Sequence, residues 1–206
     1  MLEIWGRTNS INVQKVMWTV AELGLDHVRH DAGGAFAVVD TGDYIKMNPN
    51  RLVPTIRDGD LVLWESHAIV RYLAARHDAG GLWPTDIAVR ADSDRWMDWM
   101  ANTLNAPMRP VFWGLIRTPP EQRDDAAIAE GAKQLAVDFS ILDAALAGRD
   151  FIAGDTLTMG DIPIGCAAYR YLALDIERPS LPNMEAWYGR LTGRPAFRDH
   201  VMLPLT

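Results

Sequence analysis

The order of β-prone and helical runs is the feature that most constrains how this chain folds. Short β-prone runs alternate with helical runs up to residue 77, and no convincing β-prone run appears beyond residue 85. The runs 2–5 and 26–30 favour strands, and the segment between them carries apolar residues at helical spacing and ends at Gly24. A strand, a helix and a second strand in this order predict a βαβ unit with a parallel strand pair.

The segment that follows has the pattern of a hairpin. β-prone runs at 52–56 and 61–64 flank an Asp58-Gly59 turn, and strands joined so closely must be antiparallel. A further helix is expected to begin at Glu65-Ser66. The combined order, β-α-β followed by β-β-α, predicts a mixed four-stranded sheet with helices, which is the plan of a thioredoxin-like domain.

The rest of the chain is predicted to be all helical. Apolar residues between Ile128 and Leu146 recur at steps of three and four, which is typical of an amphipathic helix. The predicted fold class is therefore α/β plus all-α. We expect a thioredoxin-like domain over 1–77, a linker over 78–85 that is rich in Gly and Pro, and a helical domain over 86–206.

Composition and motifs exclude several classes of function. The chain has 27 acidic and 20 basic residues, a net charge of −7 and no basic run, which disfavours nucleic-acid binding. One cysteine, Cys166, excludes an internal disulfide framework. His27 and His30 would lie on opposite faces of a strand, so no metal site is expected. Without a signal peptide or an apolar run of roughly 18 residues, we expect a cytoplasmic protein that does not bind membranes.

The loop between the first strand and the first helix is the candidate reactive site. In residues 6–13 there is no cysteine, but Thr8, Ser10 and Asn12 offer hydrogen-bond donors next to a helix N-terminus, which favours an anion. Lowering a thiol pKa from about 8.5 by about 2 units takes about 2.7 kcal/mol. One hydroxyl donating to a charged sulfur supplies about 1.5–3 kcal/mol. The loop therefore suits a thiolate supplied by another molecule, although this segment taken alone favours helix capping as the role of Ser10 and Asn12.

Two further positions are suited to binding a peptide. Pro54 interrupts a β-prone run, and a cis bond before it would leave the amide and carbonyl of Val53 free to pair with an extended peptide. A trans proline on an edge strand is the alternative. Ser66 at a helix start can bind a carboxylate and Glu65 an ammonium group, as an α-amino acid requires. The alternative is a plain helix cap.

These features together resemble the cytosolic glutathione transferases, in the theta-like or nu-like bacterial classes. The resemblance rests on Asn48–Ile56 with its Val-Pro pair, on Asp58-Gly59 and on Leu63–Leu73 with its Glu-Ser pair. A Thr158–Asp161 capping box and Arg194–Phe197 follow at family-like positions. The family implies a thioredoxin-like domain joined to a helical domain, a homodimer, glutathione as the thiol and a role in detoxification.

The resemblance also assigns roles to individual residues. Ser10 falls at the position of an activating serine, with Asn12 and then Thr8 as the next candidates. Val53, after a cis Pro54, is expected to pair with the cysteinyl backbone of glutathione. The other expected glutathione contacts are Glu65 and Ser66 for the γ-glutamyl end, Arg51 or Lys46 for the glycyl carboxylate, and Asp94 for the partner subunit's glutathione.

The second substrate is expected to lie against the first helix of the all-α domain. Its cleft is predicted to be apolar, although each lining residue is also explained as core. The candidate lining residues are Trp99, Thr103, Met108, Phe112 and Trp113. The predicted reaction is attack of the glutathione thiolate on a small apolar electrophile. Glutathione-dependent reduction of a disulfide or peroxide, and non-catalytic carriage of a hydrophobic ligand, are the alternatives.

Overall fold

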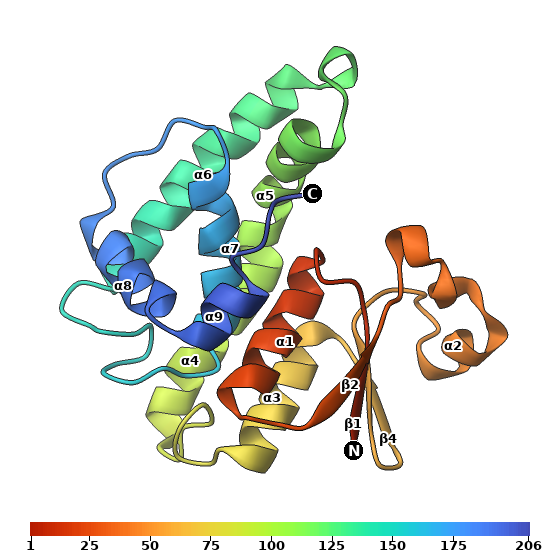
Figure 1. Ribbon diagram of the computed structural model, residues 1–206. Helices are drawn as coiled ribbons and strands as arrows, with labels where there is room; N and C mark the ends of the chain where they lie inside the picture. The colour runs from red at the N-terminus through yellow and green to blue at the C-terminus, as the bar shows by residue number, and fades with distance from the viewer.

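The computed structural model describes residues 1–206, arranged as a sheet-containing lobe beside a larger helical lobe (Figure 1). The sheet has the strand order β2-β1-β3-β4, with β1 and β2 parallel and the other two pairings antiparallel. The mixed four-stranded sheet that the sequence predicts is therefore confirmed. Its strands are β1 (Leu2–Trp5), β2 (His27–His30), β3 (Thr55–Asp58) and β4 (Leu61–Trp64).

The register of the sheet follows from its buried face. Ile4 of β1 lies opposite Ile56 of β3, and both side chains are fully buried. The β3–β4 turn is closed by Gly59, whose φ of 61° is one that glycine adopts without strain. The hairpin predicted from Asp58-Gly59 is thus present with the expected turn residue.

Helices α1 (Ile11–Glu22) and α3 (Ser66–His77) cover the buried face of the sheet. The apolar residues Val13, Val16 and Val20 of α1 pack against that face because they recur at helical spacing. A short α2 (Gly42–Met47) lies beside the sheet, away from the helical lobe (Figure 1).

The helical lobe has no strand, apart from an isolated bridge between Phe151 and Gly154. A long helical segment begins with α4, passes through a π-helical turn (Met100–Leu104) into α5 and ends in a second π-helical turn (Trp113–Arg117). The amphipathic pattern that ends at Leu146 belongs to α6. The helices are α4 (Ile87–Trp99), α5 (Asn105–Phe112), α6 (Asp125–Ala145), α7 (Asp161–Ala173), α8 (Pro182–Thr192) and α9 (Pro195–His200).

The capping box at the start of α7 forms only in part. The Asp161 carboxylate is fully buried and accepts from the Thr158 amide at 2.8 Å, as predicted. The Thr158 hydroxyl, however, donates to the same carboxylate instead of capping the helix. The Ile152 amide and the Trp187 indole, each at 2.9 Å, complete the set of donors, so Asp161 stabilises the fold of the helical lobe.

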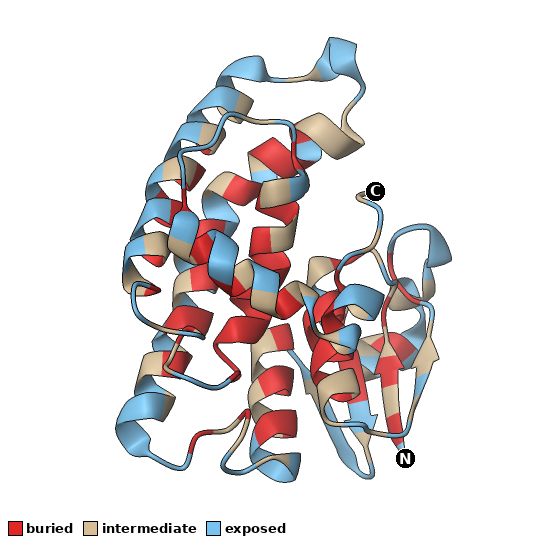
Figure 2. Cartoon of the chain, turned by 60° about the vertical axis from the view of Figure 1, so that its left-hand side comes forward, coloured by how far each residue is buried: buried red, intermediate tan, exposed pale blue.

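The two lobes share a packed interface, in which α1 is covered on its second side by α7 and α9. Figure 2 shows the buried residues, in red, gathered on the inner faces of the helices. Trp18 of α1 is fully buried there and meets the Phe197 ring edge-on at 4.8 Å between centroids. Arg194 donates to both carboxylate oxygens of Glu22 at 2.7 and 2.6 Å. These contacts fix the second half of α1 against the helical lobe. None of the helices combines the length and apolar character needed to cross a membrane.

Candidate active site

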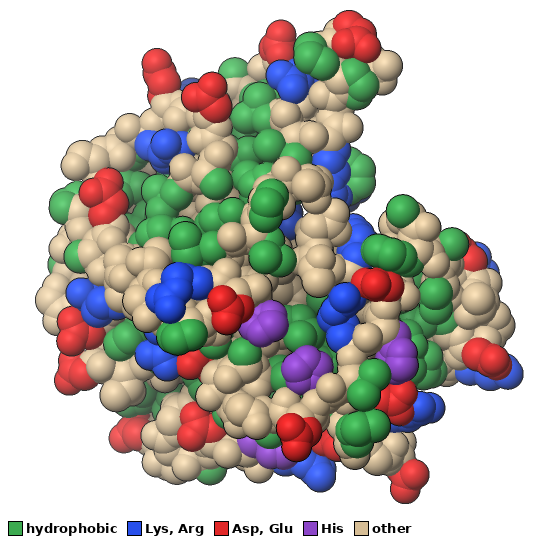
Figure 3. Space-filling view, viewed as in Figure 1, with side chains coloured by type: hydrophobic (Ala, Val, Ile, Leu, Met, Phe, Trp, Pro, Cys, Tyr) green, Lys and Arg blue, Asp and Glu red, His purple; other side chains and the backbone are tan.

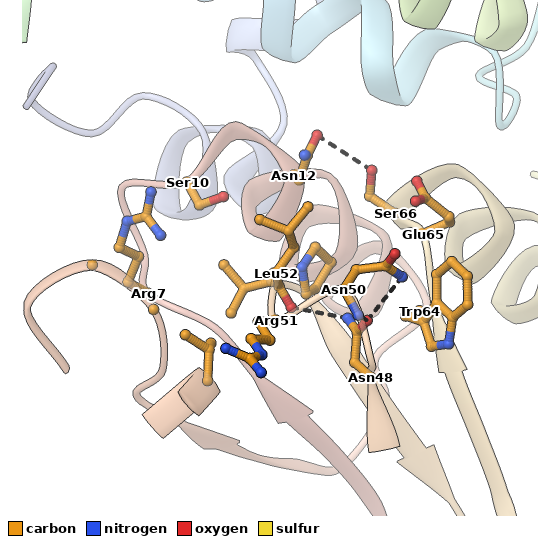
Figure 4. A pocket seen from close by; sticks show the side chains of 15 residues that line it. Arg7, Ser10, Asn12, Asn48, Asn50, Arg51, Leu52, Trp64, Glu65 and Ser66 are labelled. Carbon is orange, nitrogen blue, oxygen red and sulfur yellow. Dashed lines mark hydrogen bonds between the residues drawn. The ribbon is translucent and has the colours of Figure 1, made fainter. Parts of the chain in front are cut away.

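A cavity of about 260 Å³ lies where the β1–α1 loop meets the loop before β3 and the start of α3 (Figure 4). Arg7 and Ser10 lie at one end of it, and Trp64, Glu65 and Ser66 lie at the other. Its remaining lining residues are Asn12, Gly33, Gly34, Val39, Asn48, Asn50, Arg51, Leu52, Val53 and Pro54.

Ser10 occupies the N-cap position of α1, but its side chain makes no capping hydrogen bond. The hydroxyl lines the cavity, and the residue is only 8% exposed. The amides of Ile11, Asn12 and Val13, at the start of α1, also have no backbone partner. The Ser10 side chain therefore does not cap α1, and its hydroxyl is a free donor beside the positive N-terminal end of that helix.

Asn12 is oriented by two donors on its oxygen. Its Oδ1 accepts from Lys15 Nζ at 3.0 Å and from Ser66 Oγ at 3.4 Å, so the amide nitrogen is left free to donate elsewhere. Burial lowers the pKa of Lys15 to about 8, which leaves it mainly protonated at neutral pH. Burial, with Lys15 and Arg71 nearby, lowers the pKa of His67 to about 2, so its Nε2 accepts from Lys15 at 2.9 Å.

The Val53–Pro54 peptide bond is cis, as the sequence resemblance implied. Pro54 is buried, and Val53 lies in the loop immediately before β3. Neither the amide nor the carbonyl of Val53 takes part in a hydrogen bond within the chain. Both groups belong to a cavity-lining residue, so they are available to the backbone of a bound peptide.

Glu65 and Ser66 mark the join between β4 and α3. Glu65 has a φ of 73°, a conformation that is unfavourable for a residue with a side chain and is often found at functional sites. Its carboxylate forms no ion pair or hydrogen bond within the chain. Ser66 and the following amides open α3 without backbone partners. An acceptor for an ammonium group and donors for a carboxylate therefore lie side by side.

The two candidates for the glycyl carboxylate differ in position. Arg51 lines the cavity and reaches Asp40 only at 3.8 Å, whereas Lys46 is exposed, pairs with Asp43 at 2.9 Å and does not line the cavity. Arg7 is a cavity-lining cation that the sequence argument did not include. It packs against two glycines with positive φ, and an added Cβ at Gly33 would lie 3.0 Å from its guanidinium.

Two other candidates lie away from this cavity. Thr8 is exposed and lines a separate recess with Arg7 and Phe36, not the cavity that contains Ser10. Asp94 of α4 accepts from Arg71 Nε at 2.6 Å, also away from the cavity.

Cys166 is buried in α7, where burial raises the pKa of its thiol to about 12. No cluster of three or more His, Cys, Asp or Glu side chains is placed to hold a metal ion.

A second cavity of about 170 Å³ adjoins the first on the side of the helical lobe. Ser10, Asn12 and Arg7 line both cavities. Met108, Phe112 and Trp113 form part of its wall, whereas Trp99 and Thr103 do not line it. Trp99 packs edge-on against Trp96 at 5.0 Å, on another side of α4.

The second cavity is more cationic than an apolar cleft. Its lining contains four arginines and no Asp or Glu. Sequence reasoning missed all four because they come from three separate segments. One signal was available: Arg170 stands in the otherwise apolar run of α7. The four are Arg7, Arg109, Arg117 and Arg170.

Comparison with known proteins places this geometry in a family. The chain matches the family described as glutathione S-transferase, N-terminal domain, over residues 9–76 and the corresponding C-terminal domain over residues 104–195. The chain belongs to the glutathione S-transferase family. It is 44% identical to glutathione S-transferase GstB of Escherichia coli (strain K12), with 100% of both chains covered.

Other members of the glutathione S-transferase family are also similar over almost the whole chain. A crystal structure of the theta class glutathione S-transferase from Xanthomonas axonopodis pv. citri, with glutathione bound, has a TM-score of 0.96 and 47% identity. The match covers 100% of this chain and 99% of the Xanthomonas chain. Glutathione S-transferase 3 of Zea mays is 31% identical to this chain, and the match covers 97% of this chain and 93% of the maize protein. The predicted family and its two-part fold are therefore confirmed.

Proposed function

We propose that this chain binds glutathione in the first cavity and catalyses attack of its thiolate on a small electrophile held in the second. The observation that carries the proposal is that Ser10 and Asn12 line both cavities. A sulfur placed there would contact a free hydroxyl on one side and a bound electrophile on the other. Met108, Phe112 and Trp113 would contact the apolar part of the electrophile.

The first cavity offers complementary groups along the length of a tripeptide. The free amide and carbonyl of Val53 would pair with the cysteinyl residue, as in strand addition. Glu65 would accept from the γ-glutamyl ammonium, and the Ser66 amide with the α3 amides after it would donate to the γ-glutamyl carboxylate. Arg51, rather than Lys46, would bind the glycyl carboxylate because it lines the cavity.

The sulfur would be stabilised as an anion by neutral donors. The Ser10 hydroxyl and the first amides of α1 would donate to it, and the Asn12 amide nitrogen would be the second side-chain donor. A hydrogen bond to a charged group contributes about 1.5–3 kcal/mol, which corresponds to about 1–2 units of thiol pKa. The attacking sulfur then displaces the leaving group without any protein nucleophile, and Cys166 takes no part.

We further propose that the functional unit is a homodimer, as the family resemblance implies. In that assembly Asp94 of α4, held by Arg71 at 2.6 Å, would approach the partner subunit's glutathione. Analytical ultracentrifugation tests the assembly. An Asp94→Asn variant should then weaken glutathione binding only under conditions in which the dimer is present.

Parallel assays test the reaction itself. The protein should consume glutathione with a chlorodinitrobenzene substrate faster than with a small mixed disulfide or an organic hydroperoxide. The reverse order would instead favour reduction, and quenching of tryptophan fluorescence by hydrophobic ligands with no thiol consumed would favour a carrier. A crystal grown with glutathione would show which side chain lies within about 3.2 Å of the sulfur, a hydrogen-bonding distance.

A further inference from the structure

Three of the four arginines of the second cavity are unusual because they lack anionic partners. Arg7 and Arg109 make no side-chain hydrogen bond within the chain, and neither they nor Arg170 forms an ion pair with an Asp or Glu carboxylate. Arg117 differs from the other three because it donates to the main-chain oxygen of Thr206, the last residue of the sequence, at 3.2 Å from Nε and 3.0 Å from Nη2. In a protein with a net charge of −7, three unpaired cations in one recess need a specific explanation. Figure 3 shows blue Lys and Arg side chains bordering the notch between the two lobes.

Arg170 shows that this arrangement is built into the fold. The residue is only 7% exposed, yet its only side-chain hydrogen bond runs from Nη2 to the Asn9 carbonyl oxygen at 3.2 Å. Its buried Nε has no partner. A buried guanidinium with an unsatisfied donor is costly unless an anion completes its contacts.

Aromatic rings hold these guanidinium groups in place. Arg170 lies over the Phe112 ring at 4.0 Å, and Arg117 lies over the Phe112 and Trp113 rings at 5.1 and 5.0 Å. Arg109 lies over the Trp113 ring at 5.8 Å. The same rings that would contact the carbon skeleton of a substrate therefore position cations beside it.

Repulsion between neighbouring cations lowers the pKa of two of these arginines, in addition to burial. Burial and then the neighbouring charge of Arg117 lower the pKa of Arg170 to about 10, and no carboxylate acts to raise it. Burial and the charge of Arg7 lower the pKa of Arg117. Arg170 therefore remains protonated at neutral pH, and an incoming anion would relieve the repulsion.

We propose that the electrophile of this enzyme carries a carboxylate next to its apolar body, and that Arg109, Arg117 and Arg170 bind that carboxylate. The inference rests on the proposed transferase function and narrows its substrate class to small acidic electrophiles. In the reaction the glutathione sulfur supplies the electron pair of the new S–C bond, and the leaving halide departs with the pair of the broken bond. The thiol proton has already passed to solvent, and the substrate carboxylate is unchanged.

Arg7 is left out of the assignment because it lines both cavities and could instead contact a carboxylate of glutathione. Arg109, Arg117 and Arg170 line the second cavity and not the first. A substrate role for these three therefore predicts that removing one of them leaves the KM for glutathione unchanged.

Two electrophiles that differ only in charge provide the test. The rates with 4-chloro-3-nitrobenzoate and its neutral amide are each divided by the rate of the uncatalysed reaction with glutathione. We expect the wild-type enzyme to prefer the benzoate, and Arg117→Met to reduce that preference about tenfold or more, the range for a lost charge-assisted hydrogen bond. Arg109→Met should act in the same direction. Lys133→Met, which removes an exposed charge on α6 away from the cavity, is the matched control and should leave the preference unchanged.

The possible outcomes separate this inference from the proposed function. Conversion of both substrates with no preference for the benzoate, or equal losses for both in Arg117→Met, would overturn the anion site while leaving the transferase intact. A raised glutathione KM in Arg117→Met and Arg109→Met would overturn it as well, because these arginines would then serve glutathione. Quenching of tryptophan fluorescence by unreactive 3-nitrobenzoate, lost in both arginine variants, would support the site even if neither substrate were converted.

Discussion

Replacing Ser10 by alanine separates a chemical role from a structural one. The hydroxyl makes no hydrogen bond within the chain, so its loss should leave the free energy of unfolding almost unchanged. An ordinary capping serine would instead lose about 1 kcal/mol. If the hydroxyl donates to the thiolate, its removal costs about 1.5–3 kcal/mol of anion stabilisation and raises the pKa of bound glutathione by about 1–2 units.

The pH profile gives the direction of this effect. A higher thiol pKa means less thiolate at neutral pH, so kcat/KM for a chlorodinitrobenzene substrate should fall about 10- to 100-fold in Ser10→Ala. Activity should recover partly as the pH rises, because the thiolate then forms without the hydroxyl. Ultraviolet absorbance of the thiolate, titrated in the enzyme–glutathione complex, measures the pKa directly, and calorimetry should show glutathione binding largely retained.

Two companion variants decide how the result is read. Thr8→Val removes a hydroxyl from the same loop but outside the cavity, and should change neither the pKa nor the rate. An unchanged pH profile in Ser10→Ala would refute the role assigned to this hydroxyl. In that event Asn12→Ala should shift the profile instead, since Asn12 is the other side-chain donor shared by both cavities.

Three further predictions concern the fold around the site. The pKa of Lys15 is about 8 in the folded protein and 10.5 when the side chain is exposed. Between these pH values the unfolded state binds more protons than the folded state. The free energy of unfolding should therefore rise with pH over this range, by about 3 kcal/mol from Lys15. Denaturant titrations should show this rise in the wild type relative to Lys15→Met, and equal slopes would contradict it. Asp161→Asn should lower the free energy of unfolding, measured by chemical denaturation, by at least about 2 kcal/mol because four donors converge on the Asp161 carboxylate. The control Asp124→Asn, at an exposed helix cap, should have little effect. Gly165→Ala should lower the free energy of unfolding by about 1–3 kcal/mol because the added Cβ would lie 2.8 Å from Trp18. The control Gly189→Ala, in an open helical position, should be neutral or stabilising. Equal melting temperatures of the two variants would show that the packing around Gly165 adjusts to the added methyl group.

The sheet could be predicted from sequence because its signals are local. The Asp58-Gly59 turn and the helix ending at Gly24 each depend on a few adjacent residues, and both are present in the structure. The candidate residues around the first cavity were similarly found because they stand at element boundaries, where helix starts and free backbone groups are expected. Ser10 and Ser66 are examples.

The arginines of the second cavity could not be predicted from local sequence in the same way. Arg109 and Arg117 belong to the α5 segment and Arg170 to α7, and only the tertiary fold brings their side chains to one recess. Lys15 was missed for a related reason. A lysine on an amphipathic helix is normally expected on the exposed face, but α1 is covered by the sheet on one side and by the helical lobe on the other, so Lys15 is buried.

The two sets of donors at this site act on different charges. Ser10 and Asn12 are neutral and suffice to stabilise one anion, the thiolate. A thiolate approaching a carboxylate-bearing electrophile faces a second cost, because two like charges about 4 Å apart repel by about 4 kcal/mol at an effective dielectric constant of about 20. Neutral donors do not offset that repulsion, whereas a group of unpaired cations on the electrophile side does. The absence of any carboxylate from the lining of the second cavity is therefore a requirement of the inferred reaction, and introducing one, as in Arg109→Glu, should suppress the benzoate reaction far more than the reaction of its amide.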